Sequence, residues 1–228
     1  MRSCLILPDD PRPETKAWLS LGSTALLLDL RAAPGASALA FLGEARAVSP
    51  RPRIYARLGP ALDEALEALL ETPPDGIFLD GTEGGADVQR LAAKLAVFEA
   101  RAGLADGATT IIAGAAQTPA AIFALHGYKD CSPRLRALAW EGDALAAFLD
   151  LLSPVDPAAP ALAVARGLLV LAAAAAGVPA LDAPSARPRD AAAFRAECLR
   201  ARRDGFKGKV ATLREEVAII EEIFGPGR

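Results

Sequence analysis

Short apolar runs alternate with longer amphipathic segments along almost the whole chain. The runs are rich in Leu, Ile, Val and Ala, and each is five or six residues long. Continuous apolar runs of this length are typical of strands that are buried on both faces. They predict strands at residues 3–8, 25–30, 53–58, 76–80, 110–115, 135–140, 179–183 and 209–213.

The segments between these runs have the spacing of helices. The period is clearest near the end of the chain, where Val217, Ile220 and Ile223 fall on one face of a helix. Helices are predicted at residues 12–22, 36–48, 60–72, 85–103, 119–127, 143–152, 159–176, 189–204 and 214–224.

This alternation predicts an α/β fold with a parallel sheet, because buried strands that alternate with helices pair through right-handed crossovers. Eight such units in 228 residues fit a compact (β/α)8 TIM barrel, which we expect to form a single domain over residues 1–228. A doubly wound open sheet is the alternative. However, no G-x-G-x-x-G follows the first strand, and no G-x-x-x-x-G-K-[ST] occurs in the chain.

Composition and charge limit the classes of partner that we expect this protein to bind. Apolar residues make up 52% and charged residues 23%, as in ordinary soluble domains. The net charge of −3 gives no basic footprint for nucleic acid or an anionic membrane. The most apolar segment, 167–181, is too short to span a bilayer. Three cysteines far apart argue against disulfides, and without a signal peptide at the start we expect a cytoplasmic protein.

The carboxyl ends of the predicted strands carry polar residues of both charges. In a barrel these ends form the mouth at which active sites lie. A mixed acidic and basic rim suits an anionic substrate, with or without a metal ion. The residues there are Asp9, Asp10, Asp29, Arg31, Arg57, Asp80, Gln117, Glu141, Asp143, Asp182, Thr212 and Arg214.

Six segments also resemble, in order, the motifs of one enzyme family. They are RSCLILPDDPRPE (2–14), ALLLDLRAA (25–33), YARLG (55–59), GIFLDGTEG (76–84), IIAGAAQTPAAI (111–122) and DGFKGKVATLREEVAIIEEIFGP (204–226). The last, similar to a G-F-x-G-K-x-x-I-H-P ending, is the most specific. By their joint order and spacing, the segments resemble the HpcH/HpaI aldolase and citrate lyase beta-subunit family over nearly the entire chain.

The resemblance implies a divalent-metal-dependent carbon–carbon lyase or aldolase, often acting on acyl-CoA thioesters. It implies that Arg57, at the end of the third strand, grips a substrate carboxylate or carbonyl. The family's two magnesium-binding carboxylates end the fifth and sixth strands, which places Gln117 and Asp143 at the metal positions. For Asp143 this requires a one-residue shift, because ungapped alignment puts Ala144 at the ligand aspartate. Asp29 and Asp80 are expected to contact the substrate.

Several positions depart from the family pattern, so the scaffold is retained while the reaction centre is altered. A glutamine carbonyl can bind Mg²⁺ but brings no charge, and Asp80 could compensate for this. Without a metal, Arg57 is the matched cation that could stabilise an enolate oxygen. The departures are Arg31-Ala32, Gly59, Asp80-Gly81, Gln117 and Thr212-Leu213-Arg214.

Each candidate also has a structural alternative. Arg57 could pair with Asp29 or Asp80 inside the barrel mouth. Asp143 could be the N-cap of the helix that follows, since Asp is favoured there. Gln117 could hydrogen-bond neighbouring loops.

Two functions therefore stay open from sequence. One is a citrate lyase beta-subunit-like lyase or aldolase for a small oxoacid or acyl-CoA thioester, with Mg²⁺ held by Gln117 and Asp143. The other is a catalytically degenerate barrel that binds an anionic metabolite or acts as a non-catalytic subunit. The resemblance further implies a homo-oligomer, with a trimer as the family's common form. We expect neither a nucleic-acid nor a membrane partner.

Overall fold

Eight parallel strands form a closed barrel in the computed structural model, which describes residues 1–32, 34–59, 62–151, 159–184 and 190–225. Each strand pairs with the next, and β8 pairs with β1. This confirms the predicted (β/α)8 barrel and excludes the open sheet. The strands are β1 (Ser3–Ile6), β2 (Ala25–Asp29), β3 (Arg53–Leu58), β4 (Gly76–Leu79), β5 (Thr110–Ala115), β6 (Leu135–Trp140), β7 (Ala180–Asp182) and β8 (Gly208–Ala211).

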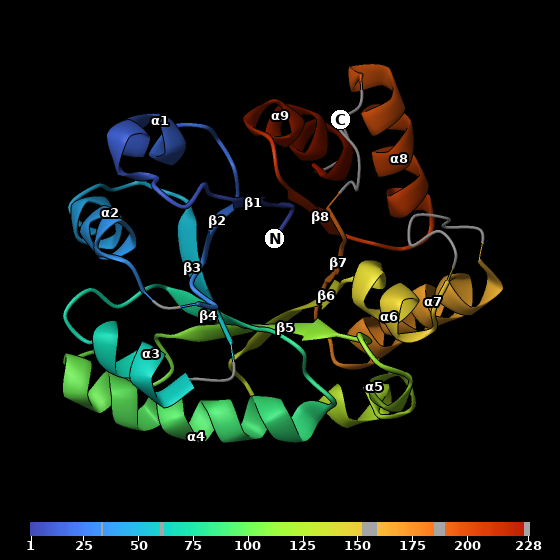
Figure 1. Ribbon diagram of the computed structural model, residues 1–228, viewed down its shortest axis with the longest axis horizontal. Coiled ribbons are helices and arrows are strands. Elements are labelled where there is room, and N and C mark those ends of the chain that lie inside the picture. The colour runs from blue at the N-terminus through green and yellow to red at the C-terminus, as the bar shows by residue number, and fades with distance from the viewer. Residues whose placement is uncertain (33, 60–61, 152–158, 185–189, 226–228) are drawn as a thin grey trace.

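Helices surround the barrel and cover its outer face (Figure 1). Those predicted from the apolar spacing are present, and the β6–β7 connection contains two of them, α6 and α7. The helical elements are η1 (Arg12–Glu14), α1 (Thr15–Leu19), α2 (Ala36–Arg46), α3 (Leu62–Ala68), α4 (Gly85–Ala102), α5 (Pro119–Phe123), η2 (Leu125–Tyr128), α6 (Gly142–Phe148), α7 (Pro160–Ala175), α8 (Ala191–Arg203) and α9 (Arg214–Phe224). The single-domain assignment of residues 1–228 stays a prediction.

The barrel interior is filled by side chains from alternate strand residues. Tyr55 spans two neighbouring strands: it faces Gly76 on β4, and its hydroxyl contacts Thr110 Oγ1 on β5 at 3.0 Å. A Cβ at Gly76 would collide with the tyrosine ring, so the glycine makes room for this crossing. Tyr55 is 1% exposed and blocks the middle of the barrel.

An ion pair is buried between the helices and the barrel. The Arg134 guanidinium donates to both carboxylate oxygens of Glu99, at 2.6 and 2.8 Å. The same carboxylate accepts the backbone N–H groups of Gly107 and Thr109, in the turn that leads into β5. Glu99 therefore joins α4 to the start of two strands, which is a structural role.

No helix in the described part of the chain combines the length and apolar character needed to cross a bilayer.

Candidate functional site

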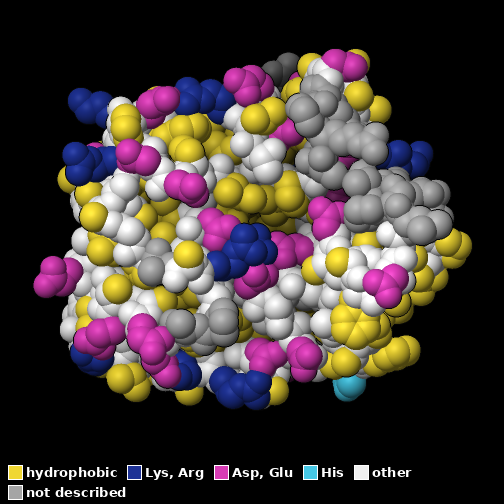
Figure 2. All heavy atoms as spheres, in the orientation of Figure 1, with side chains coloured by type: hydrophobic (Ala, Val, Ile, Leu, Met, Phe, Trp, Pro, Cys, Tyr) yellow, Lys and Arg dark blue, Asp and Glu magenta, His cyan; other side chains and the backbone are white. Residues whose placement is uncertain are grey.

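Four charged side chains enter the barrel mouth because each lies two residues beyond an apolar residue that points into the barrel. Residues i and i+2 of a strand face the same side, and this direction is kept by Asp80 and Glu141, which lie one residue past their strands. The space-filling view shows acidic and basic side chains gathered at the centre of this face (Figure 2). The pairs are Leu27 with Asp29, Tyr55 with Arg57, Phe78 with Asp80, and Ala139 with Glu141.

Arg57 lies at the centre of this group, which we name the mouth cluster (Asp29, Arg31, Arg57, Asp80, Gln117 and Glu141). Its Nη2 donates to Asp80 Oδ1 at 2.8 Å and to Glu141 Oε2 at 2.8 Å. The guanidinium lies over the Phe78 ring, 5.0 Å from the ring centroid. Its Nε is buried and has no hydrogen-bond partner among the described residues. Arg57 therefore bridges two carboxyl groups and keeps one unused donor.

Gln117 reaches the same two carboxyl groups from the end of β5. The chain leaves this strand through Ala116, whose φ of 64° lies in the left-handed region that non-glycine residues rarely adopt. Gln117 Nε2 then donates to Asp80 Oδ1 at 2.9 Å and to Glu141 Oε2. Thr118 caps α5 by accepting the Ala121 N–H at 3.1 Å. Both partners lie just after their strands, in the loops that follow β4 and β6, so Gln117 bonds neighbouring loops as its structural alternative predicts.

Arg31 extends the cluster toward the rim. Its Nη2 donates to Asp29 Oδ2 at 2.6 Å, and its Nη1 lies 3.4 Å from Asp80 Oδ2. Arg57 pairs with Asp80, as its structural alternative predicts, and in addition with Glu141. Cations and carboxylates thus alternate across the mouth.

The two carboxyl groups that Arg57 bridges differ in proton affinity. Burial raises the pKa of Glu141 to about 7, and the charge of Asp80 acts in the same direction while Arg57 opposes it. Burial alone would also raise the pKa of Asp80, but hydrogen bonds from Arg57 and Gln117 outweigh it and leave that pKa below its ordinary value. Near neutral pH, Asp80 is therefore ionised while Glu141 retains a large share of its proton.

Asp143 lies outside these contacts. It is exposed in the first turn of α6, which begins at Gly142 with Glu141 at the N-cap position. The capping alternative for Asp143 is therefore wrong, because the helix begins earlier than the pattern indicated. No hydrogen bond or ion pair among the described residues joins Asp143 to Arg57, Asp80 or Gln117. Its role as a metal ligand stays a prediction.

Magnesium does not fit the mouth cluster. This ion prefers an octahedral shell of oxygen ligands. Among the described residues, no group of three or more His, Cys, Asp or Glu side chains could hold a metal ion. Asp80 and Glu141 come closest, but Arg57 Nη2 and Gln117 Nε2 both donate to them and occupy the space where an ion would bind. A divalent ion would have to displace the guanidinium, so we derive no step through it.

The sequence places Glu141 on the rim but does not single it out, because the resemblance assigns the sixth-strand role to Asp143. The signal was present in the two-residue period of Ala137 and Ala139, which predicts that Glu141 also points inward. Asp143 lies beyond the first helical residue, where that period no longer applies.

Other rim residues make contacts elsewhere. Asp182 pairs with the buried Lys209 at 3.0 Å and with Arg166 at 3.1 Å. Arg214 pairs with Glu14 and stacks over Trp18, 4.2 Å from the ring centroid. These contacts fix the surrounding helices and do not join the mouth cluster.

Solved structures share this architecture. No protein-family model matches the chain, and no curated protein matches its sequence. RipC from Yersinia pestis is 25% identical with a TM-score of 0.72, over 100% of this chain and 96% of RipC.

Two further matches contain ligands. CitE from Mycobacterium tuberculosis, in complex with magnesium, acetoacetate and coenzyme A, is 22% identical with a TM-score of 0.71, over 100% and 82% of the two chains. The Haloferax volcanii malate synthase magnesium and glyoxylate complex is 16% identical with a TM-score of 0.82, over 100% and 76%. The resemblance predicted from the motifs is confirmed, and the chain has the barrel fold of the citrate lyase beta-subunit and malate synthase proteins.

Proposed function

We propose that this chain is a carbon–carbon lyase or aldolase for a small oxoacid or an acyl-CoA thioester, with the mouth cluster as its reaction centre. The observation that carries the proposal is the bridge from Arg57 to both Asp80 and Glu141 at the carboxyl mouth of the barrel. Barrel enzymes have their active sites at this mouth. The acetoacetate, coenzyme A and glyoxylate bound by its structural neighbours support a substrate of this class.

Arg57 would bind the substrate oxygen that becomes negative. A guanidinium can hold a carboxylate or an enolate oxygen through two parallel hydrogen bonds. Asp80 and the Phe78 ring hold the group in place before substrate arrives, and the unused Nε donor is available to the ligand. Such preorganised donors stabilise charge that develops in the transition state. In this proposal Arg57 supplies the positive charge, and magnesium is assigned no step.

Asp80 and Glu141 would move the protons. In the cleavage direction, ionised Asp80 takes the proton of the substrate hydroxyl, and the carbon–carbon bond breaks to give a carbonyl product. The electron pair of that bond passes to the enolate held by Arg57, and Glu141 returns a proton to its carbon. Condensation runs through the same transfers in reverse. A general acid with a pKa near the working pH suits this role, and the pKa of Glu141, raised to about 7 by burial, meets that condition.

A second function is favoured by Gln117. Where the resemblance implies a carboxylate ligand, the chain has an amide that bonds the cluster's own acidic groups. A barrel with such a self-bonded mouth could bind an anionic metabolite through Arg57 without turning it over, or act as a non-catalytic subunit. Self-association and a cytoplasmic location stay predictions under either function.

The test is a panel of condensation and cleavage assays with oxaloacetate, glyoxylate and acetyl-CoA, followed by product NMR and by thiol release. Turnover that is lost in both Arg57→Gln and Glu141→Gln supports the lyase. Binding without turnover, lost in Arg57→Gln, supports the alternative. Arg214→Gln is the matched control, because this rim arginine lies outside the mouth cluster. If neither turnover nor Arg57-dependent binding occurs, the lyase proposal and the proposal of a metabolite-binding barrel both fail.

A further inference from the structure

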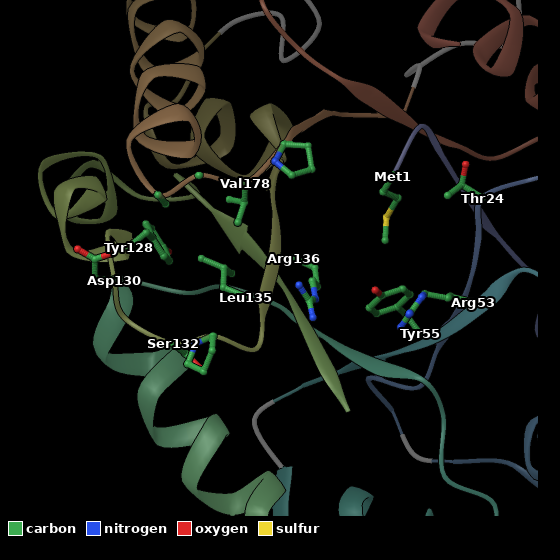
Figure 3. Close-up of a pocket in the computed structure, with 14 residues that line it drawn as sticks. Met1, Thr24, Arg53, Tyr55, Tyr128, Asp130, Ser132, Leu135, Arg136 and Val178 are labelled. Carbon is green, nitrogen blue, oxygen red and sulfur yellow. The ribbon is translucent and has the colours of Figure 1, made fainter. Parts of the chain in front are cut away.

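A cavity opens at the end of the barrel opposite the mouth cluster, where the strands begin. Its volume is about 870 Å³, within the range of ordinary small-molecule sites. Figure 3 shows the side chains of Arg53, Tyr55 and Arg136 projecting into the space between β3 and β6. Thr24, Ser132 and Asp130 also line it. We name this space the amino-terminal cavity.

Arg53 enters the cavity from the first residue of β3, the strand that also carries Arg57. Arg53, Tyr55 and Arg57 alternate along β3, and Tyr55 belongs to the apolar filling of the barrel. The three side chains therefore point inward at three levels. Tyr55 is 1% exposed and separates the two arginines. The amino-terminal cavity is thus distinct from the mouth cluster, although one strand supplies an arginine to each.

Arg136 enters the cavity because of an irregularity in β6. Ile111 pairs with Leu135, but Ile112 pairs with Ala137, so Arg136 is an extra residue on its strand. Leu135 faces the outer core and Ala137 the barrel interior. The additional residue allows Arg136 to point inward as well as Ala137. Bulges of this kind often re-aim a side chain next to a functional site.

Neither arginine is neutralised by a residue that the structure describes. The side chains of Arg53 and Arg136 form no hydrogen bond or ion pair among the described residues. This differs from Arg57 and Arg134, which pair with buried carboxylates. Asp130 is the one acidic residue among those that line the cavity, so two cations face one anion in a chain of net charge −3.

We propose that the amino-terminal cavity binds a small oxyanion with two or more negative charges, a phosphate ester or a dicarboxylate, between Arg53 and Arg136. Each guanidinium can hold such a group bidentately, which a single ammonium cannot do. The hydroxyls of Tyr55 and Ser132, which line the same space, add neutral polar contacts. A bound dianion would also relieve the repulsion between two like charges that face one cavity. This site does not depend on the function proposed for the opposite mouth.

The experiment is calorimetric titration of the full chain with inorganic pyrophosphate and, separately, with succinate at low salt. We expect saturable binding of at least one, weakened by added NaCl, and at least a roughly tenfold loss of affinity in Arg53→Gln and in Arg136→Gln. Pyrophosphate alone would assign phosphate esters, and succinate alone dicarboxylates. Arg200→Gln, an exposed arginine on α8, should bind as wild type does.

The Arg57→Gln variant shows at which end of the barrel the anion binds. Pyrophosphate binding that persists in this variant supports the amino-terminal cavity, and binding that disappears moves the ligand to the mouth cluster and overturns the proposal. Circular dichroism checks that each variant is folded. Both arginines are exposed, so both variants should fold; if Arg53→Gln does not, Arg136→Gln decides. No saturable binding of either anion, or wild-type affinity in Arg136→Gln, would also overturn the proposal.

Discussion

Arg57 Nη2 donates to Glu141 Oε2 at 2.8 Å, although the two residues are 84 positions apart and come from β3 and the end of β6. The contact crosses the mouth of the barrel and exists because the sheet closes on itself. It brings a fixed cation against a carboxyl group whose pKa is raised to about 7, chiefly by burial. The chemistry proposed for this mouth depends on that relationship.

Glu141 should make stability depend on pH. Burial raises its pKa from the ordinary 4.5 to about 7, so between these values the folded state holds a proton that the unfolded state has released. The free energy of unfolding therefore falls as the pH rises through this window. Relative to Glu141→Gln, the wild-type melting temperature should decline between about pH 5 and pH 8. Glu67→Gln, which alters an exposed pair with Arg101, is the control. If the melting temperatures of wild type and Glu141→Gln change with pH in the same way, the pKa of Glu141 is not raised.

Arg57→Gln should destabilise the fold. It leaves Asp80 and Glu141 half-buried without their shared cation, and breaking a buried pair on one side costs about 3 kcal/mol. Part of this is recovered when Glu141 takes up its proton fully. Urea denaturation measures the loss. Arg101→Gln, which breaks an exposed pair with Glu67, should change the free energy of unfolding little. If the two variants lose the same free energy of unfolding, Arg57 does not stabilise the mouth cluster as proposed.

Magnesium should not bind the wild-type mouth tightly, because the N–H donors of Arg57 and Gln117 already face the two carboxyl groups. Calorimetric titration with MgCl₂ should show no saturable site, and chelation of divalent ions should leave ligand binding unchanged. Gln117→Glu should create a site, since it brings a third acidic side chain next to Asp80 and Glu141. Gln117→Asn is its uncharged control. Tight magnesium binding by the wild type would show that Arg57 yields its place to an ion.

Arg134→Ala should destabilise the fold without a direct effect on the mouth. It removes the partner of Glu99, whose side chain is 1% exposed, and such a change costs about 3–5 kcal/mol. Chemical denaturation should show this loss, while the folded variant keeps any ligand affinity of the wild type. Arg90→Ala, at an exposed pair with Asp87, is the control. A loss of ligand affinity in folded Arg134→Ala would link this ion pair to the mouth.

Much of the fold could be predicted from sequence because the signals are local. Apolar runs such as 110–115 and 135–140 correspond to β5 and β6, and the period of Val217, Ile220 and Ile223 corresponds to α9. The order of strands around the barrel follows from the handedness and length of the connections.

The candidate site could be predicted only in part. The strand pattern predicts that Arg57 and Asp80 lie at the mouth, because their position depends on the strand alone. The choice between Glu141 and Asp143 depends on where α6 begins, and helix starts are not fixed by apolar spacing. The partners of Arg57 and the bulge at Arg136 depend on contacts between strands, which no single segment encodes.

The most direct measurement is deuterium exchange at the α-carbon of acetyl-CoA or pyruvate in D₂O, followed by proton NMR. If Arg57 stabilises an enolate and Glu141 exchanges its proton with carbon, the wild type will label the methyl group, and Glu141→Gln will slow labelling by at least about 100-fold. Arg57→Gln should do the same, and Arg214→Gln should not. Undiminished labelling in Glu141→Gln, or no labelling by a wild-type protein that binds the compound, would contradict the proposed chemistry at this mouth.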